Sequence, residues 1–152
     1  MIKPWLVRVV YRLQVWWWWL TRPTTSGVKS LVFCGDSILL VRISYGHKRY
    51  TLPGGGVKRR ESFLAAAKRE LYEEAGVVAD VTYFGKYQQS IQYKNDTVYC
   101  FSGVVTKPVA IPDGGEVVEA QWFSKTQLPS NRVSSVDKII SLYYQNKDSE
   151  DK

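Results

Sequence analysis

Residues 54–77 read GGGVKRRESFLAAAKRELYEEAGV, and the rest of the chain is organised around this stretch. The three glycines predict a sharp turn, because glycine tolerates positive φ. Residues 62–75 predict a helix of about four turns at 3.6 residues per turn, with Phe63, Leu64, Ala67 and Leu71 on its buried face. Gly76 follows as a left-handed C-cap.

Three glutamates lie near the end of this predicted helix. Glu70, Glu73 and Glu74 are spaced three and four residues apart, which places their carboxylates on one helical face. The helix macrodipole disfavours negative charge at this end. A solvated acidic helix end is one interpretation; the other is a divalent cation, since hard cations such as Mg2+ bind carboxylate oxygens.

The spacing of the fixed residues resembles the Nudix box. Gly55 is followed after five residues by Glu61 and, after seven more, by the run REL-YEEAGV from Arg69 to Val77. The resemblance implies an α/β/α sandwich with a mixed β-sheet and a Mg2+- or Mn2+-dependent pyrophosphohydrolase. Its implied metal ligands are Glu70, Glu73 and Glu74, and its implied bracing residues are Gly55, Glu61, Arg69 and Gly76.

Composition bounds the class of protein. The chain has 152 residues, enough for one domain, and its 45% hydrophobic and 23% charged residues are typical of a globular fold. Cys34 and Cys100 are the two cysteines and each lies in an apolar run, so we expect free thiols and a cytoplasmic setting. We expect an N-terminal extension (residues 1–23), a hydrolase domain (24–147) and a charged tail (148–152).

The N-terminal segment MIKPWLVRVVYRLQVWWWWLTR is rich in tryptophan and basic residues. An amphipathic helix that ends at Pro23 is predicted by apolar residues at helical spacings, namely Leu6, Val9, Val10, Leu13, Trp17 and Leu20. Arg8 and Arg12 argue against a secretory signal and a spanning helix. The helix is expected to pack on the domain or on a second copy in a homodimer; contact with a membrane surface is the alternative.

Several runs beyond this segment predict strands. Residues 28–34 and 38–44 flank a Gly-Asp-Ser hairpin turn, residues 77–87 and 97–105 follow the box, and residues 116–123 precede the last loop. Thr24 to Gly27 is expected to be a linker, residues 88–96 a polar connection and residues 133–144 a closing helix.

The candidate substrate-binding residues lie on either side of the box. Arg42, His47 and Arg49 are cationic candidates for contact with a substrate phosphate, and His47 could equally be a solvated loop residue. Gly54 and Gly55 are further candidates. Tyr93 is a candidate for stacking on a base, although an aromatic residue at this position could instead belong to the core.

Glu119 is a candidate for the general base, together with the box carboxylates. In proteins of similar type an acidic residue precedes a Trp-Phe pair, and here Glu116 and Glu119 both precede Trp122-Phe123. Glu119 has the more family-like spacing. We therefore assign catalytic roles to Glu73, Glu74, Arg69 and Glu119 as hypotheses.

The expected function is hydrolysis of the diphosphate linkage of a nucleoside diphosphate derivative by metal-assisted attack of water. Two other classes remain open: a non-catalytic nucleotide-binding or regulatory module on the same fold, and a membrane- or RNA-associated protein recruited through the basic N-terminus. A small-molecule nucleotide is the expected partner rather than nucleic acid. The expected location is cytoplasmic, with the membrane periphery as the alternative.

Overall fold

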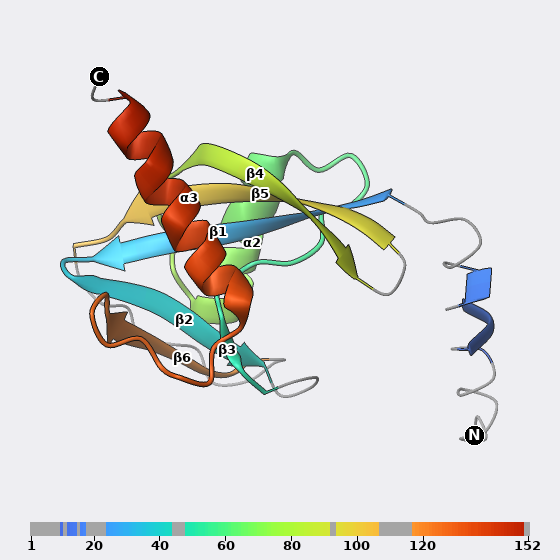
Figure 1. Cartoon of the computed structure of the whole chain (residues 1–152), viewed down its shortest axis with the longest axis horizontal. Coiled ribbons are helices and arrows are strands. Elements are labelled where there is room, and N and C mark those ends of the chain that lie inside the picture. Colours follow the sequence, from blue (N-terminus) through green and yellow to red (C-terminus); the bar gives the residue numbers. More distant parts are fainter. Residues whose placement is uncertain are drawn as a thin grey trace.

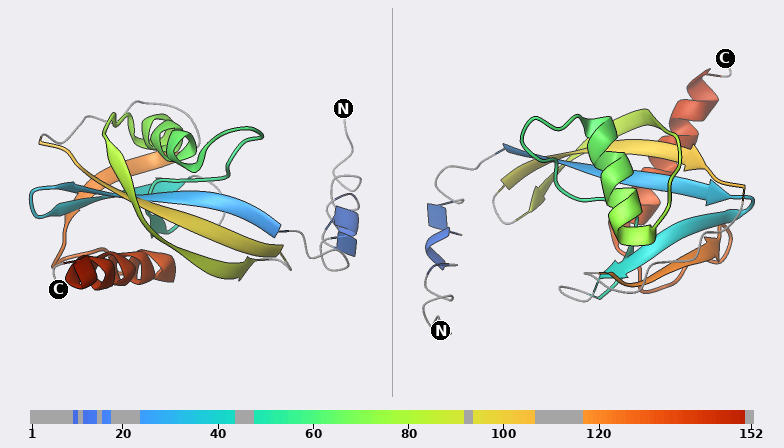
Figure 2. Two further views of the ribbon diagram at one scale, coloured as in Figure 1. Left: turned by 90° about the horizontal axis from the view of Figure 1, so that it is seen from above. Right: turned by 180° about the vertical axis from the view of Figure 1, so that it is seen from behind.

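A computed structural model describes residues 10, 12–14, 16–17, 24–43, 48–91, 94–106 and 117–150. Its strands are β1 (Thr24–Cys34), β2 (Ser37–Ile43), β3 (Tyr50–Thr51), β4 (Val81–Ile91), β5 (Lys94–Val104) and β6 (Val117–Ser124). Its two named helices are α2 (Phe63–Ala75) and α3 (Ser134–Glu150). The elements form three layers, with α2 and α3 on opposite faces of the sheet (Figures 1 and 2).

The sheet is mixed, as predicted. Its order is β3-β2-β1-β5-β4, and β6 pairs with β2. The β1 and β5 strands are parallel, whereas the other pairs are antiparallel. Among the described residues, β1 pairs with β2 beside the hairpin turn, at Phe33–Ile38 and Cys34–Ser37. The opposite half of β1 is therefore open to another partner on that edge.

The glycine turn runs along this open half of β1. The Val28 amide donates to the Gly55 carbonyl over 2.9 Å, and the Ser30 amide donates to the Pro53 carbonyl over 2.9 Å. Gly54 has φ +147°, and an added Cβ would lie 2.0 Å from the Val28 carbonyl oxygen. Only glycine fits this close approach without moving the backbone.

Side chains of β2 point alternately into two core clusters, one on each face of the sheet. Leu39 and Val41 of β2 face the cluster under α2, whereas Ile38 and Leu40 face the cluster under α3. This period of two is the side-chain geometry of a strand buried on both faces. The core therefore fixes the register of the strands that carry the site.

The helix α2 begins one residue later than predicted and ends where predicted, and its buried face includes Ala67 and Leu71 as expected. Ser62 caps α2 by accepting a hydrogen bond from the Ala65 amide over 3.1 Å, and Gly76 ends it at φ 63°. The buried residues are Ala66, Ala67, Leu71 and Ala75. The prediction that Phe63 and Leu64 are buried was wrong, since they are 37% and 44% exposed. Small alanines let the helix approach the sheet closely.

Other boundaries also differ from the predictions. Residues 24–27, expected to be a linker, form the start of β1 because they pair in parallel with residues 95–98 of β5. The expected connection at 88–96 is mostly strand, since β4 continues to Ile91 and β5 begins at Lys94. Residues 77–80 precede β4 rather than belonging to it. The closing helix extends to Glu150, beyond the predicted end at Tyr144.

The expected N-terminal helix lies largely outside the described residues. Within residues 1–23 the structure describes positions 10, 12–14, 16 and 17, and all six are helical. Val10, Leu13, Trp16 and Trp17 are each more than half exposed, so these four side chains are not packed in the domain core. No helix among the described residues combines the length and apolar character needed to span a bilayer.

Candidate active site

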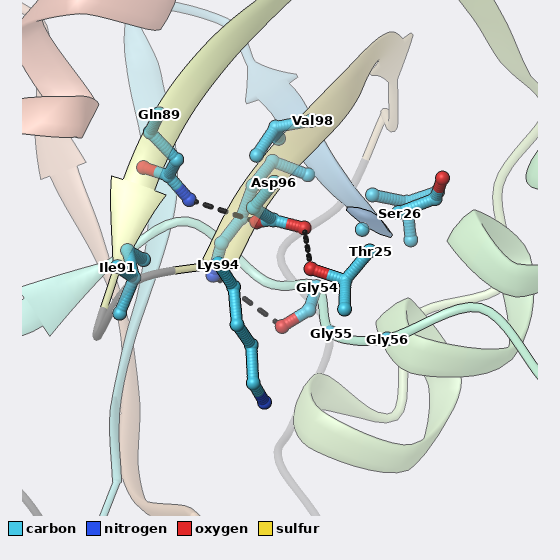
Figure 3. Close-up of a pocket in the computed structure, with 13 residues that line it drawn as sticks. Thr25, Ser26, Gly54, Gly55, Gly56, Gln89, Ile91, Lys94, Asp96 and Val98 are labelled. Carbon is cyan, nitrogen blue, oxygen red and sulfur yellow. Dashed lines mark hydrogen bonds between the residues drawn. The ribbon is translucent and has the colours of Figure 1, made fainter. Parts of the chain in front are cut away.

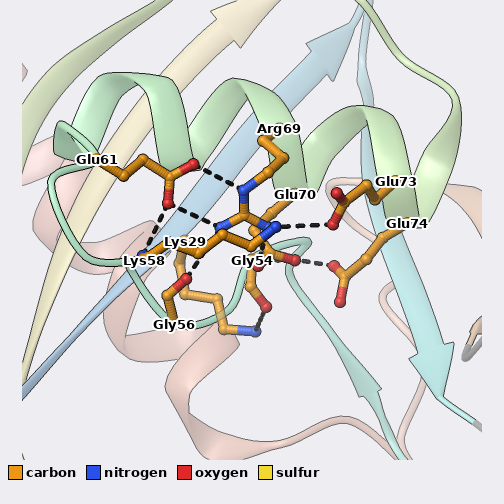
Figure 4. Close-up of polar contacts among 9 residues, drawn as sticks. All are labelled: Lys29, Gly54, Gly56, Lys58, Glu61, Arg69, Glu70, Glu73 and Glu74. Carbon is orange, nitrogen blue, oxygen red and sulfur yellow. Dashed lines mark hydrogen bonds and ion pairs between the residues drawn. The ribbon is translucent and has the colours of Figure 1, made fainter.

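Arg69 organises the acidic cluster on α2. Its guanidinium donates to both carboxylate oxygens of Glu61, over 2.7 and 3.0 Å, and to one oxygen each of Glu70 and Glu73, over 2.7 and 3.1 Å (Figure 4). It also donates to the Gly56 carbonyl over 3.1 Å. The planar fork of arginine suits such bidentate pairing with carboxylates.

These contacts change the pKa values of Glu61 and Arg69. The Arg69 hydrogen bonds, together with a 2.8 Å bond from the Lys58 amide, lower the pKa of Glu61 to about 2. The same partnership with Glu61 raises the pKa of Arg69 above its ordinary value. Glu61 therefore stays ionised across the neutral range and keeps Arg69 in place.

The glycine turn fixes two of the carboxylates. The Gly54 amide donates to Glu74 Oε2 over 2.8 Å, which joins the turn to the last part of α2. Gly55 lies directly against Glu70, since an added Cβ would be 2.7 Å from Glu70 Oε1. Glycine at these positions thus lets the backbone approach the acidic cluster.

Each box carboxylate has a protein donor. Glu70 and Glu73 accept from Arg69, and Glu74 accepts from Gly54. Within the described ranges no three His, Cys, Asp or Glu side chains form a cluster with metal-binding geometry. The donor chemistry nevertheless suits a hard divalent cation, because Glu70, Glu73 and Glu74 lie on one face of α2 and Glu73 is 52% exposed.

Glu119 lies opposite Arg42 across the β2–β6 pair. The Arg42 guanidinium donates to Glu119 Oε2 over 2.8 Å, and the two side chains are 34% and 37% exposed. Burial and the neighbouring Glu119 carboxylate raise the pKa of Tyr50. Two residues predicted to serve separate roles, substrate binding and proton transfer, thus form one ion pair.

A cavity of about 370 Å³ adjoins the glycine turn (Figure 3). Its walls come from the start of β1, from Gly54, Gly55 and Gly56, and from the facing ends of β4 and β5. Asp96 is held in this wall by hydrogen bonds from Thr25 Oγ1, over 2.8 Å, and Gln89 Nε2, over 3.0 Å. One wall of the cavity therefore carries a hydrogen-bonded carboxylate.

Only some of the other residues predicted to bind substrate lie at the cavity. Gly54 and Gly55 line the cavity, but Arg42 does not, and Arg49 is an exposed residue before β3. His47 and Tyr93 lie outside the described residues, as does Glu116. The structure thus joins the box and the glycine turn into one site and places the Arg42–Glu119 pair on a neighbouring part of the sheet.

The sequence interpretation missed Lys29 and the Asp96 network. Lys29 Nζ donates to the carbonyls of Leu52, over 2.8 Å, and Gly54, over 3.3 Å, and to Thr51 Oγ1 over 3.3 Å. Burial lowers the pKa of Lys29, while the nearby Glu74 and Glu70 carboxylates act in the opposite direction. The available signal was a lysine inside the apolar run GVKSLVF.

The fold and this arrangement define a NUDIX domain. Residues 23–143 match the NUDIX domain family, and the chain belongs to that family. A NUDIX hydrolase from Nitrosomonas europaea is similar in structure, with a TM-score of 0.70, 26% identity, and coverage of 82% of this chain and 90% of that one.

Curated relatives match over shorter stretches. NAD-capped RNA hydrolase NudC of Deinococcus radiodurans is 35% identical over 81 residues, which are 53% of this chain and 28% of that protein. Diphosphoinositol polyphosphate phosphohydrolase 3-alpha of Mus musculus is 40% identical over 73 residues, which are 47% and 44% of the two chains. The chain thus spans less than half the length of these relatives.

The NUDIX domain of Shewanella oneidensis NrtR, solved with ADP-ribose, shares the fold. Its TM-score is 0.71 at 17% identity, with coverage of 84% of this chain and 91% of that one.

Proposed function

We propose that this chain is a divalent-metal-dependent pyrophosphohydrolase that cleaves the diphosphate linkage of a nucleoside diphosphate derivative. The observation that carries the proposal is the ordered acidic cluster, in which Arg69 joins Glu61, Glu70 and Glu73. Glu70, Glu73 and Glu74 are the residues that would hold Mg2+ or Mn2+. The bound cation would supply charge neutralisation at the phosphoryl oxygens and activation of water.

The remaining roles fall to the chain's own residues. Glu61 and Arg69 hold the carboxylates in position, and the Gly54 amide orients Glu74. A box carboxylate or Glu119 would accept the proton from the attacking water. Arg42 and Arg49 are the described cationic candidates for the substrate phosphates, and the cavity beside Gly55 would receive the group attached to them.

The test is a turnover screen of the full chain with Mg2+, with Mn2+ and with a chelator. The panel contains nucleoside triphosphates, nucleotide sugars, dinucleoside polyphosphates, ADP-ribose, NAD-capped RNA and a diphosphoinositol polyphosphate. The last three are the compounds that the relatives are named for or bound to. We expect metal-dependent cleavage of a diphosphate linkage, with products identified by chromatography. Binding of a nucleotide without any cleavage would instead support the non-catalytic module.

We propose a separate interaction role for the N-terminal segment. Val10, Leu13, Trp16 and Trp17 are 56%, 61%, 59% and 59% exposed, and large apolar side chains exposed together favour an interface. The expected partner is a second copy of the chain. Light scattering of the full chain and of a variant lacking residues 1–22 should give a dimer and a monomer; co-sedimentation of only the full chain with anionic liposomes would favour the membrane alternative.

A further inference from the structure

Lys29 is a charged residue in the middle of β1, where its neighbours Val28, Ser30 and Leu31 are fully buried. A lysine in such a position is costly unless its ammonium group is paired and hydrogen-bonded. Its three protons have three acceptors within reach, namely Leu52 O, Gly54 O and Thr51 Oγ1. The Lys29 ammonium, which also lines the cavity beside the glycine turn, thus donates to three acceptors within the protein.

All three acceptors belong to the segment that leads from β3 into the glycine turn. Backbone hydrogen bonds already hold this segment along β1, through Ser30 with Pro53 and Val28 with Gly55. Lys29 adds side-chain hydrogen bonds to the same segment, at Thr51, Leu52 and Gly54. The turn is thereby attached to β1 on both sides of Pro53.

The backbone of Gly54 links Lys29 to the acidic cluster. Its carbonyl accepts from Lys29 Nζ over 3.3 Å, and its amide donates to Glu74 Oε2 over 2.8 Å. Figure 4 shows Lys29, Gly54 and Glu74 together beside α2. A change in the position of the Gly54 backbone would therefore move the donor that orients Glu74.

The charge balance of the acidic cluster also gives Lys29 a role. Glu61, Glu70, Glu73 and Glu74 contribute four negative charges, while Arg69 and Lys29 contribute two positive ones. Arg69 contacts Glu61, Glu70 and Glu73, whereas Lys29 is connected to Glu74 through the backbone of Gly54. The two cations together leave two negative charges, which one divalent cation would neutralise.

We propose that Lys29 is a positioning residue for the hydrolytic reaction, which clamps the glycine turn to β1 and so holds Glu74 in place through the backbone of Gly54. This inference rests on the proposed function, because the reaction it serves is the one assigned to the box. Lys29 acts through Glu74 rather than on the substrate. Its loss should consequently lower kcat and leave KM nearly unchanged.

The test compares Lys29→Met with Lys68→Met in the full chain. Methionine has a similar length and no donor, so it removes all three hydrogen bonds. Lys68 is a matched control, because it lies on α2 but pairs with the exposed Asp80 carboxylate over 3.0 Å. The measurements are the melting temperature, kcat and KM at saturating Mg2+, and exchange of the Gly54 amide proton by NMR.

For Lys29→Met we expect a folded protein whose kcat is lower by about tenfold or more with KM within about threefold, since misplacement of a catalytic group acts on the chemical step. The Gly54 amide should exchange about tenfold faster, because local opening of the turn becomes easier. Lys68→Met should match the unmodified protein in all of these values.

An unchanged kcat or unchanged Gly54 exchange in a folded Lys29→Met variant would overturn the proposal, and so would a rise in KM at constant kcat. If this variant does not fold, Lys29→Arg carries the same test, because it keeps the charge but alters the donor geometry. The exchange measurement needs no substrate. If the unmodified protein hydrolyses nothing in the panel, the proposed function fails while Gly54 exchange still decides whether Lys29 clamps the turn.

Discussion

Gly55 and Glu70 are in such close contact that a single methyl group would separate them. A Cβ added at Gly55 would lie 2.7 Å from Glu70 Oε1, whereas one added at Gly56 would meet nothing within 4 Å. The side chain of Glu70 is only 15% exposed and is also bonded to Arg69. It therefore has little freedom to move away.

Gly55→Ala should consequently displace Glu70 and lower kcat by about 100-fold, the cost typical of moving a catalytic group by about 1 Å. Gly56→Ala is the matched control and should retain kcat within about twofold. Steady-state kinetics of both variants at saturating Mg2+ provides the measurement. Equal activity of the two alanine variants would show that contact between Gly55 and Glu70 is unimportant for the reaction.

Ionisation of Glu61 makes stability depend on pH. Its pKa is about 2 in the folded protein, below the ordinary value of 4.5. A lowered pKa stabilises the fold above the unfolded pKa, and this contribution is lost as pH falls through the folded pKa. Melting temperatures of the unmodified protein and Glu61→Gln should therefore differ most above about pH 5 and converge toward pH 2. A constant difference over that range would contradict the lowered pKa.

The Arg42–Glu119 pair allows the role of each partner to be separated. The pair is partly exposed, so its contribution to stability should be below about 1 kcal/mol and both Glu119→Gln and Arg42→Met should fold. If Glu119 accepts the proton, Glu119→Gln lowers kcat by about 100-fold, while Arg42→Met mainly raises KM. We expect this split in steady-state kinetics. A Glu119→Gln variant with normal kcat would assign proton transfer to a box carboxylate.

The box could be interpreted from sequence because its information is local. Helical spacing places Glu73 within reach of both Arg69 and Glu70, and Gly76 signals the end of the helix whatever surrounds it. The predicted end of the helix at Ala75 was confirmed, and its start lies one residue later than predicted because Ser62 is the N-cap. Arg69, expected to be a bracing residue, contacts both Glu70 and Glu73. The mixed sheet followed from the family resemblance and was likewise confirmed.

The rest of the site depends on pairing between distant residues. The polar run Thr24–Gly27 has the composition of a linker, and only its parallel pairing with β5 makes it a strand. Lys29 contacts Gly54 because the glycine turn lies along the half of β1 that does not pair with β2. No local sequence pattern predicts this arrangement. Phe63 fits the apolar period of α2, yet its ring stacks on Tyr99 at 3.8 Å near the surface.

The central claim is that the box carboxylates support metal-dependent hydrolysis, and Glu74→Gln tests it most directly. Glutamine keeps an oxygen that can accept from the Gly54 amide but removes the charge, so the fold should persist. Asp80→Asn removes an exposed charge outside the box and is the control. Turnover is measured as Mg2+ is titrated, with the best substrate of the panel. We predict a loss of about 100-fold or more in Glu74→Gln at every Mg2+ concentration and none in Asp80→Asn; near-normal, Mg2+-dependent turnover by folded Glu74→Gln would contradict the account.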